Sequence, residues 1–223
     1  MRITRKQLKK IILESLSINQ PTIYCDMDGV IANFDIGAIN KMNEFLNFTS
    51  NGGVIESSSL RKSVNKVLSA YGIGFQIDLS MDIDADSNIK KLKYSSIIQD
   101  PGQFFYNLPP LIDGTTSLWP FINSLGLKVN ILSAPIESSK GMPAAQGKEL
   151  WVKDNLNPQP SEIIIVPAIQ KQDYAKTNGI SNILIDDKEE TIIQWNAAGG
   201  IGILHQTGNS QLTILELQKI LSL

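Results

Sequence analysis

Two aspartates one residue apart are the side chains of this chain best suited to chemistry. Asp26 and Asp28 directly follow the apolar run of residues 22–25, which predicts a short buried strand. Both side chains can reach one pocket at the strand's carboxyl end if the chain turns there, and Gly29 permits that turn. One carboxylate could then attack phosphorus while the other carries a proton. Because two negative charges lie so close together, the pair also predicts a divalent cation.

Three further apolar runs are followed by residues that suit phosphate chemistry. They are Ser133 and Ala134 after residues 127–132, Lys171 after residues 162–166, and Asp186 with Asp187 after residues 182–185. A hydroxyl and free backbone N–H groups at a strand end can hold phosphate oxygens. Each residue also has a simpler interpretation: Ser133 and the second aspartate pair could be caps, and Lys171 could be a surface charge. All the simple interpretations would have to hold at once, so we favour a shared site.

The order of the apolar runs predicts the fold class. Strands that alternate with helical patterns indicate an α/β protein with a doubly wound parallel sheet and a site at its carboxyl edge. After the last aspartate pair, the pattern predicts a helix over 189–198, a strand over 201–204 and a helix over 210–221. Helical spacing over 36–48 and 60–71 predicts an inserted helical cap, which would exclude water and choose the substrate.

Three regions are therefore expected along the chain. Residues 1–20 predict an amphipathic helix, because basic and apolar side chains fall on opposite sides of it. Docking with a solvated basic face is the simplest interpretation of this helix, and binding to a membrane or a partner is the alternative. Residues 21–35 and 108–223 are expected to form the α/β core, and residues 36–107 the cap.

The motifs resemble those of the haloacid dehalogenase (HAD) superfamily of phosphotransferases. The four matching pieces are residues 26–34, residues 131–135, Lys171 and residues 183–187. Within the superfamily, the chain is most similar to the 5'(3')-deoxyribonucleotidases. Residues 102–110 resemble that family's return from cap to core, and residues 195–200 resemble the segment after its last motif. The resemblance covers about residues 22 to 205 and is least over the cap.

The resemblance implies how the matching residues would bind and transfer a phosphoryl group. Asp26 would be the nucleophile and Asp28 the general acid and base. Ser133, Ala134 and Lys171 would bind the phosphate. The implied fold is a HAD-like core with an inserted cap.

The resemblance also implies Mg²⁺ as the cofactor. Its ligands would be the carboxylates of Asp26 and Asp186 together with the backbone carbonyl of Asp28. Asp187 would bind it through water or support the other ligands. Phe34, six residues beyond Asp28, holds the place of an aromatic residue that faces the nucleobase in the deoxyribonucleotidases. Its alternative role is a hydrophobic plug between cap and core.

Two positions depart from the family pattern. Asn33 stands where the family usually has Asp, so the local contacts that support the first motif could differ from those of the family. The loop around Lys171 is longer than in the animal enzymes, so Lys176 competes with it as the phosphate-binding lysine. We favour Lys171 because it follows the strand closely, whereas the sequence predicts that Lys176 lies deeper in a helical segment.

Composition indicates an intracellular enzyme of ordinary size. The 223 residues suffice for one α/β core with a cap, and 42% hydrophobic residues can fill it. The single cysteine, Cys25, cannot form an internal disulfide and is expected to be a small buried core residue. The net charge of -2 argues against binding of duplex nucleic acid, and no apolar stretch predicts a membrane span. A cytoplasmic location is expected, and the oligomeric state is left open.

These observations predict a Mg²⁺-dependent phosphomonoester hydrolase that acts through an aspartyl phosphate, with nucleoside or deoxynucleoside monophosphates as the expected substrates. The alternatives are a phosphatase for another small phosphomonoester and a non-catalytic module that binds metal or phosphate. A carbon–halide hydrolase is a further rival, but it would have no use for Asp28.

Overall fold

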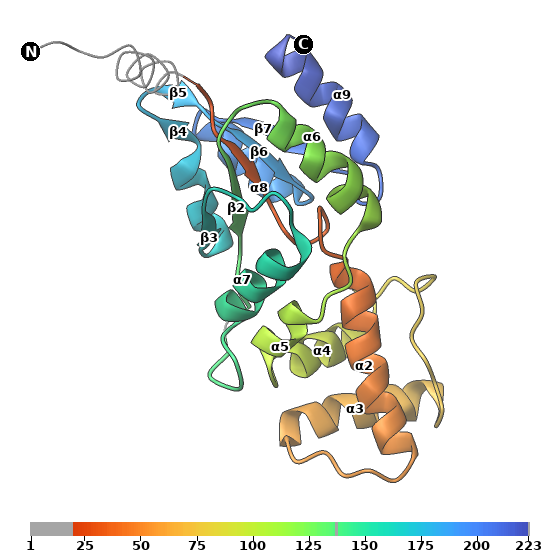
Figure 1. Cartoon of the computed structure of the whole chain (residues 1–223). Helices are drawn as coiled ribbons and strands as arrows, with labels where there is room; N and C mark the ends of the chain where they lie inside the picture. The colour runs from red at the N-terminus through yellow and green to blue at the C-terminus, as the bar shows by residue number, and fades with distance from the viewer. Residues whose placement is uncertain (1–19, 137, 223) are drawn as a thin grey trace, which may run out of the picture. The chain divides into compact units, whose positions relative to one another are not determined.

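The computed structural model describes residues 20–136 and 138–222 (Figure 1). The amphipathic helix expected over residues 1–20 therefore lies outside the described residues, except for Gln20. The chain groups into two compact units. The first contains the chain up to Ile31, from Leu111 to Ala134 and from Leu156 onward, and the second contains Ala32–Pro110 and Pro135–Asn155. Residues 135–155, which the sequence assigns to the core, group with the helical unit by their contacts.

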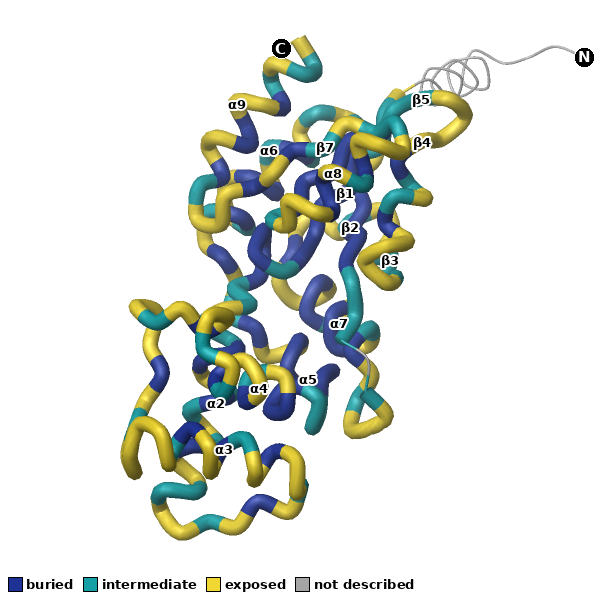
Figure 2. The backbone as a smooth tube through the Cα atoms, turned by 180° about the vertical axis from the view of Figure 1, so that it is seen from behind, coloured by how far each residue is buried: buried dark blue, intermediate teal, exposed yellow. Residues whose placement is uncertain are grey.

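The first unit is built on a parallel sheet of five strands in the order β3-β2-β1-β6-β7. Their bounds are β1 (Ile23–Cys25), β2 (Val129–Ser133), β3 (Ile163–Ile165), β6 (Ile183–Asp186) and β7 (Ile201–Leu204). The strands are apolar along almost their whole length, as expected for a sheet that is covered on both faces. Figure 2 shows β1 and β2 as dark blue, buried tubes. The α/β fold with a parallel sheet that the sequence predicts is confirmed.

The register of the strands sets the positions of the residues that follow them. Cys25 at the end of β1 pairs with Ile131 in β2 and with Ile185 in β6. Because all five strands are parallel, their carboxyl ends meet at one edge of the sheet. Asp26 and Asp186 therefore leave adjacent strands at the same level.

Helices cover both faces of this sheet. The helical segments of the first unit are η1 (Gly114–Leu118), α6 (Trp119–Ser124), η2 (Ala168–Tyr174), α8 (Glu189–Ala197) and α9 (Ser210–Leu221). On one face, Ile192 and Trp195 of α8 pack against Tyr24, Leu132 and Leu184 of the strands. The neighbouring strand residues face the opposite side, on which α6 and α9 lie (Figure 1). Cys25 is fully buried in this sheet, as the sequence predicts.

A small hairpin replaces the helix that the sequence predicts around Lys176. Strands β4 (Lys176–Thr177) and β5 (Ile180–Ser181) pair in antiparallel fashion across Asn178 and Gly179. Both turn residues have positive φ angles, of 51° and 83°, which is the backbone of the tightest hairpin turns. The prediction of a helix at Lys176 is therefore wrong, because the Asn-Gly turn signal outweighs helical spacing.

The second unit is helical. It contains α2 (Phe34–Ser50), α3 (Ser58–Tyr71), α4 (Ser87–Ile97), α5 (Pro101–Tyr106) and α7 (Ala144–Asn155). Leu46, Leu60, Val64 and Leu92 belong to its apolar core. Helices α2 to α5 lie between β1 and β2 in the chain, where the sequence predicts a helical insertion.

Side-chain caps define where α2 and α5 begin, and Asp86 caps α4 in the same way. Asn33 accepts a hydrogen bond of 3.1 Å from the backbone N–H of Ile36 and so caps α2. Asp100 caps α5 through the N–H of Gln103, and Pro101 occupies the first turn, where a missing N–H costs nothing. The side chain of Asn33 therefore accepts the capping hydrogen bond that a carboxylate at this position could accept. Across residues 20–136 and 138–222, the structure has no helix with the length and hydropathy of a membrane span.

Candidate functional site

Asp26 occupies the first position beyond the central strand of the sheet. Its backbone N–H donates a 2.8 Å hydrogen bond to the carbonyl of Ile185, which extends the pairing of β1 and β6 by one residue. Its carboxylate Oδ1 accepts a 2.8 Å hydrogen bond from the N–H of Met27. Asp26 is only 5% exposed, so its charge is held inside the protein and requires compensation.

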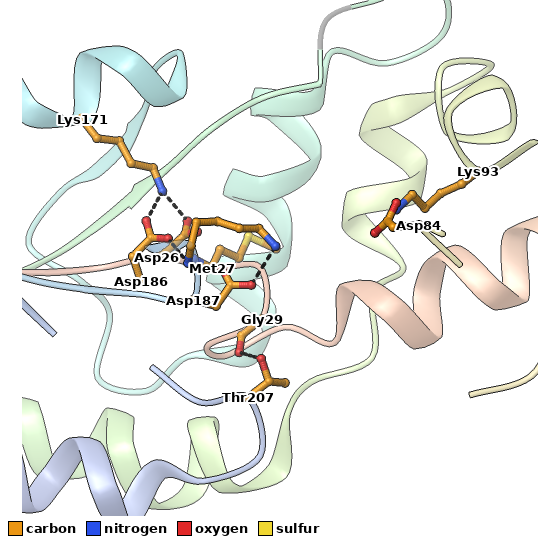
Figure 3. A network of polar contacts seen from close by, with 10 residues as sticks. Asp26, Met27, Gly29, Asp84, Lys93, Lys171, Asp186, Asp187 and Thr207 are labelled. Carbon is orange, nitrogen blue, oxygen red and sulfur yellow. Dashed lines mark hydrogen bonds and ion pairs between the residues drawn. The ribbon is translucent and has the colours of Figure 1, made fainter. Parts of the chain in front are cut away.

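Lys171 supplies that compensation from η2, the helical turn that follows β3 in the sequence. Its Nζ lies 3.1 Å from Oδ1 of Asp26 and 2.7 Å from Oδ2 of Asp186 (Figure 3). The lysine is 2% exposed, and Asp186 is fully buried. One buried cation therefore joins the carboxylates that follow two adjacent strands. Buried ion pairs of this kind are poor devices for stability alone, and they persist where function uses them.

Lys176, the competing lysine, is exposed on the β4–β5 hairpin. Its side chain runs alongside Gly199, where a Cβ would meet the lysine Nζ at 2.5 Å. Lys171, in contrast, makes ion pairs with both Asp26 and Asp186. The geometry therefore favours Lys171 as the lysine of the site.

The two neighbouring aspartates at the end of β6 have different surroundings. Asp186 Oδ1 accepts a 2.9 Å hydrogen bond from the backbone N–H of Lys188, so it orders the turn before α8. Asp187 Oδ2 lies 3.0 Å from the Nζ of Lys188, whose side chain is mostly exposed. The other oxygen of Asp187 is buried, and it has no hydrogen-bond partner among the described residues.

Burial and mutual repulsion raise the pKa values of both aspartates. For Asp186, burial comes first and the Asp26 charge second; together they outweigh the attraction of Lys171 and raise the pKa to about 7. For Asp187, burial and then Asp26 raise the pKa. Burial would lower the pKa of Lys171, but the Asp26 and Asp186 charges outweigh that effect and raise it. The lysine therefore stays protonated, and the carboxylates need a further positive charge to ionise fully.

The same three aspartates fit a divalent metal ion. Asp26, Asp186 and Asp187 each offer a carboxylate oxygen, and these oxygens lie within 4.8 Å of one another. Carboxylate oxygens are the ligands that Mg²⁺ prefers, at about 2.0–2.1 Å each. The buried, unpartnered oxygen of Asp187 is independent support for a cation here, because such a group costs free energy unless it is satisfied.

The remaining residues of the expected site lie at the carboxyl ends of β1 and β2. Asp28 is half-buried in the turn after β1, and the backbone of Gly29 takes the positive φ of 75° that the sequence anticipates there. Ser133 is the last residue of β2 and fully buried, and Ala134 follows it with partial exposure. These residues share the carboxyl edge of the sheet with Asp26 and Asp186.

Phe34 belongs to the second unit, as the first residue of α2. Its ring packs edge-on against Phe104, with centroids 5.4 Å apart, and lies 6.3 Å from the ring of Phe105. The three rings form an aromatic cluster in which Phe34 is partly exposed. The structure thus places Phe34 in a cluster that could either contact a flat ligand or simply pack.

Two residues with unusual surroundings are not identified by the sequence motifs. Lys148 on α7 is fully buried in the second unit, with its Nζ 4.2 Å from the ring centre of Phe105. Thr207 follows β7 and donates a 2.8 Å hydrogen bond to the carbonyl of Gly29 (Figure 3). Neither position is preceded by a strand-end carboxylate or a turn signal. Lys148 and Thr207 stand out only through their contacts with residues far away in the chain, which the sequence does not reveal.

Comparison with known proteins gives a fold likeness at low identity. No family model matches the chain, and no curated protein matches it. A hydrolase from Streptococcus pneumoniae TIGR4 is 12% identical with a TM-score of 0.48, covering 92% of this chain and all of that one.

Two further similar structures are HAD hydrolases. One, from Bacillus subtilis and bound to magnesium, is 12% identical with a TM-score of 0.46 and covers 91% of this chain and 99% of its own. A HAD-superfamily hydrolase of subfamily IA from Geobacter sulfurreducens is 10% identical with a TM-score of 0.42, covering 86% and 95%. These TM-scores lie below 0.5. The assignment of the fold and the site is therefore based on the strand order and the contacts given above and not on these similarities.

Proposed function

We propose that this protein is a Mg²⁺-dependent phosphomonoester hydrolase that uses Asp26 as a covalent nucleophile. One observation carries the proposal: Asp26 and Asp186 leave adjacent parallel strands and share the buried Nζ of Lys171 at 3.1 and 2.7 Å. A buried nucleophile beside a buried cation suits a substrate that brings its own negative charge. The HAD-like order of the motifs supports the same reaction class.

The first step would be attack by a carboxylate oxygen of Asp26 on phosphorus. The phosphorus–oxygen ester bond breaks, and Asp28 gives its proton to the departing alkoxide oxygen. The products of this half-reaction are an alcohol and an aspartyl phosphate on Asp26. In the second step, Asp28 removes a proton from water, whose oxygen attacks phosphorus and releases inorganic phosphate and the free Asp26 carboxylate.

The surrounding residues would stabilise the phosphoryl group in both steps. Lys171 is held rigidly between two carboxylates and keeps its proton, so it can attract phosphoryl oxygens without prior rearrangement. Ser133 and the backbone of Ala134 would donate hydrogen bonds to the same oxygens. Bound Mg²⁺ would supply positive charge that offsets the repulsion between phosphate and carboxylates. Asp26, Asp186, Asp187 and the carbonyl of Asp28 would hold it.

Nucleoside or deoxynucleoside monophosphates are the substrates we propose. Phe34 supports this choice, because it is the partly exposed member of the aromatic cluster with Phe104 and Phe105. Aromatic faces bind bases by stacking with little dependence on sequence. The helical insertion that contains Phe34 would then act as the cap that selects the substrate.

The proposal is tested with purified protein and a panel of phosphomonoesters. Phosphate release from an aryl phosphate, from nucleoside monophosphates and from a small aliphatic phosphate is measured with Mg²⁺ and with a chelator. We expect Mg²⁺-dependent release that is fastest, at low concentration, for nucleotides. Asp26→Asn should lower turnover by at least about a thousandfold, because an amide is a poor nucleophile.

Asp173→Asn serves as the matched control, since Asp173 is an exposed aspartate on η2 outside the buried cluster. It should retain full activity. Release that persists in chelator would contradict the metal, and release only from non-nucleotide esters would replace the substrate class. No release from any ester would leave the non-catalytic binding module as the better account.

A further inference from the structure

The turn after Asp28 and the side chain of Asp187 occupy one tightly shared space. A Cβ added to Gly29 would lie 2.6 Å from Cγ of Asp187, closer than side-chain carbons approach. Gly29 also has a φ of 75°, which a larger residue rarely adopts. The position of this turn therefore fixes how near the first aspartate pair comes to the second.

The loop of residues 205–209, between β7 and α9, contacts the second aspartate pair and the turn that follows the first pair. The backbone N–H of His205 donates a 2.9 Å hydrogen bond to the carbonyl of Asp186. Two residues later, the hydroxyl of Thr207 donates a 2.8 Å hydrogen bond to the carbonyl of Gly29 (Figure 3). The turn is otherwise closed by its own bonds, from the N–H groups of Val30 and Ile31 to the Met27 carbonyl at 3.4 and 3.0 Å.

This loop is itself held at both ends. The Nδ1 of His205 lies 2.8 Å from the hydroxyl of Thr213 on α9, and His205 is 3% exposed. Ser210 donates two hydrogen bonds to Asp113, from its N–H at 2.9 Å and from its hydroxyl at 2.8 Å. A loop anchored in this way can transmit the position of the sheet edge to Gly29 instead of following it.

From these contacts we propose that Thr207 is a positioning residue for the site: its hydroxyl fixes the Gly29 carbonyl and thereby the turn that carries Asp28. It acts through the turn, and it binds neither phosphate nor metal. The role in catalysis rests on the proposed hydrolase function, whereas the ordering of the turn does not. Thr207 lies outside the four motifs and 178 residues along the chain from Gly29, whose carbonyl it holds.

Two substitutions separate the hydroxyl from the bulk of the side chain. Thr207→Val keeps the shape and removes the donor, and Thr207→Ser keeps the donor. Thr116→Val is the matched control, because Thr116 is exposed on η1 and makes the same type of bond, from its hydroxyl to the carbonyl of Ile112. Steady-state turnover and the Michaelis constant for an aryl phosphate are measured at saturating Mg²⁺.

We expect Thr207→Val to lower turnover about fivefold, the factor that one net hydrogen bond is worth, with little change in the Michaelis constant. Thr207→Ser should restore most of the loss, and Thr116→Val should behave as wild type. Equal activity in Thr207→Val and wild type would overturn the proposal. So would equal loss in the Val and Ser variants, since it would assign the effect to packing.

Hydrogen exchange of the turn tests the structural half of the proposal without any substrate. In Thr207→Val, the amides of Val30 and Ile31 should exchange several times faster than in wild type, and in Thr116→Val they should not change. Unchanged exchange in Thr207→Val would overturn the inference even in an active enzyme. Faster exchange in a protein that hydrolyses no ester would support the ordering role and count against the proposed function alone.

Discussion

The two units of this protein handle charge in opposite ways. The first buries Asp26, Lys171 and Asp186 at the edge of its sheet, although burying charges costs free energy that packing does not return. The second has an apolar helical core, with Lys148 as the charged residue buried among the described part of that unit. The difference agrees with the proposed function, in which the buried charges of the first unit would serve the reaction, while the apolar core of the second unit would support the helices that carry Phe34.

The comparison predicts a large loss of both turnover and stability when the shared cation is removed. Lys171→Met should lower turnover by about a hundredfold or more, because the phosphoryl oxygens lose a preorganised charge. In the metal-free protein it should also lower the free energy of unfolding by about 3–5 kcal/mol, since Asp26 and Asp186 are left buried without their partner. Turnover by phosphate release and urea unfolding measure the two effects.

Lys176→Met is the control for this prediction, because Lys176 is exposed on the hairpin. It should change neither quantity. A large loss of turnover in Lys176→Met with a normal Lys171→Met would reverse the assignment of the phosphate-binding lysine.

A core substitution in the second unit should affect stability and leave the chemistry alone. Leu46 is fully buried in the apolar core, so Leu46→Ala should lower the free energy of unfolding by about 2–5 kcal/mol through the cavity it leaves. Turnover of an aryl phosphate should stay near wild type at temperatures where the variant is folded. Phe48→Ala, on the same helix but half exposed, should cost far less. A fall in turnover as large as that of Lys171→Met would contradict the division of labour.

Phe34 should have an intermediate and substrate-dependent effect. If it stacks on a base, Phe34→Ala should raise the Michaelis constant for nucleoside monophosphates by about 5- to 150-fold, which corresponds to the 1–3 kcal/mol of one stacked base. The constant for a small aliphatic phosphate should change little. A uniform loss on both substrates together with lower thermal stability would assign the ring to packing against Phe104.

The smallest expected effect concerns pH and His205. Burial lowers the pKa of His205 in the folded protein below its ordinary 6.5, and the Asp113 charge only partly opposes this. Below pH 6.5 the unfolded state then binds more protons than the folded state, so the free energy of unfolding should fall as the pH decreases. His205→Asn, which can keep the hydrogen bond to Thr213, should flatten this dependence. An equally steep fall in the variant would trace the dependence to other groups.

The sheet and its edge could be predicted because a polar residue marks the end of each apolar run. The apolar runs end on Asp26, Ser133 and Asp186, and parallel pairing brings such ends together without further information. Helices α8 and α9 and strand β7 begin and end within about one residue of the predicted positions, since Gly199 and Gly200 separate α8 from β7 and Gly208 precedes α9.

The hairpin at Lys176 is encoded locally, because its Asn-Gly turn indicates a hairpin more strongly than the neighbouring residues indicate a helix. Other features depend on contacts that local sequence does not encode. The grouping of residues 135–155 with the helical unit follows from packing between α5 and α7, which lie far apart in the chain. The hydrogen bond from Thr207 to Gly29 joins residues with no common motif.

The stereochemical course at phosphorus tests the central claim most directly. A phosphorothioate ester, made chiral at phosphorus by one sulfur and two oxygen isotopes, is hydrolysed in water labelled with the third oxygen isotope, and the configuration of the released thiophosphate is determined. Attack by Asp26 followed by attack of water comprises two in-line displacements, so the account predicts overall retention of configuration. Inversion would mean that water attacks the ester directly, and Asp26 would then be a metal ligand or general base with no covalent role.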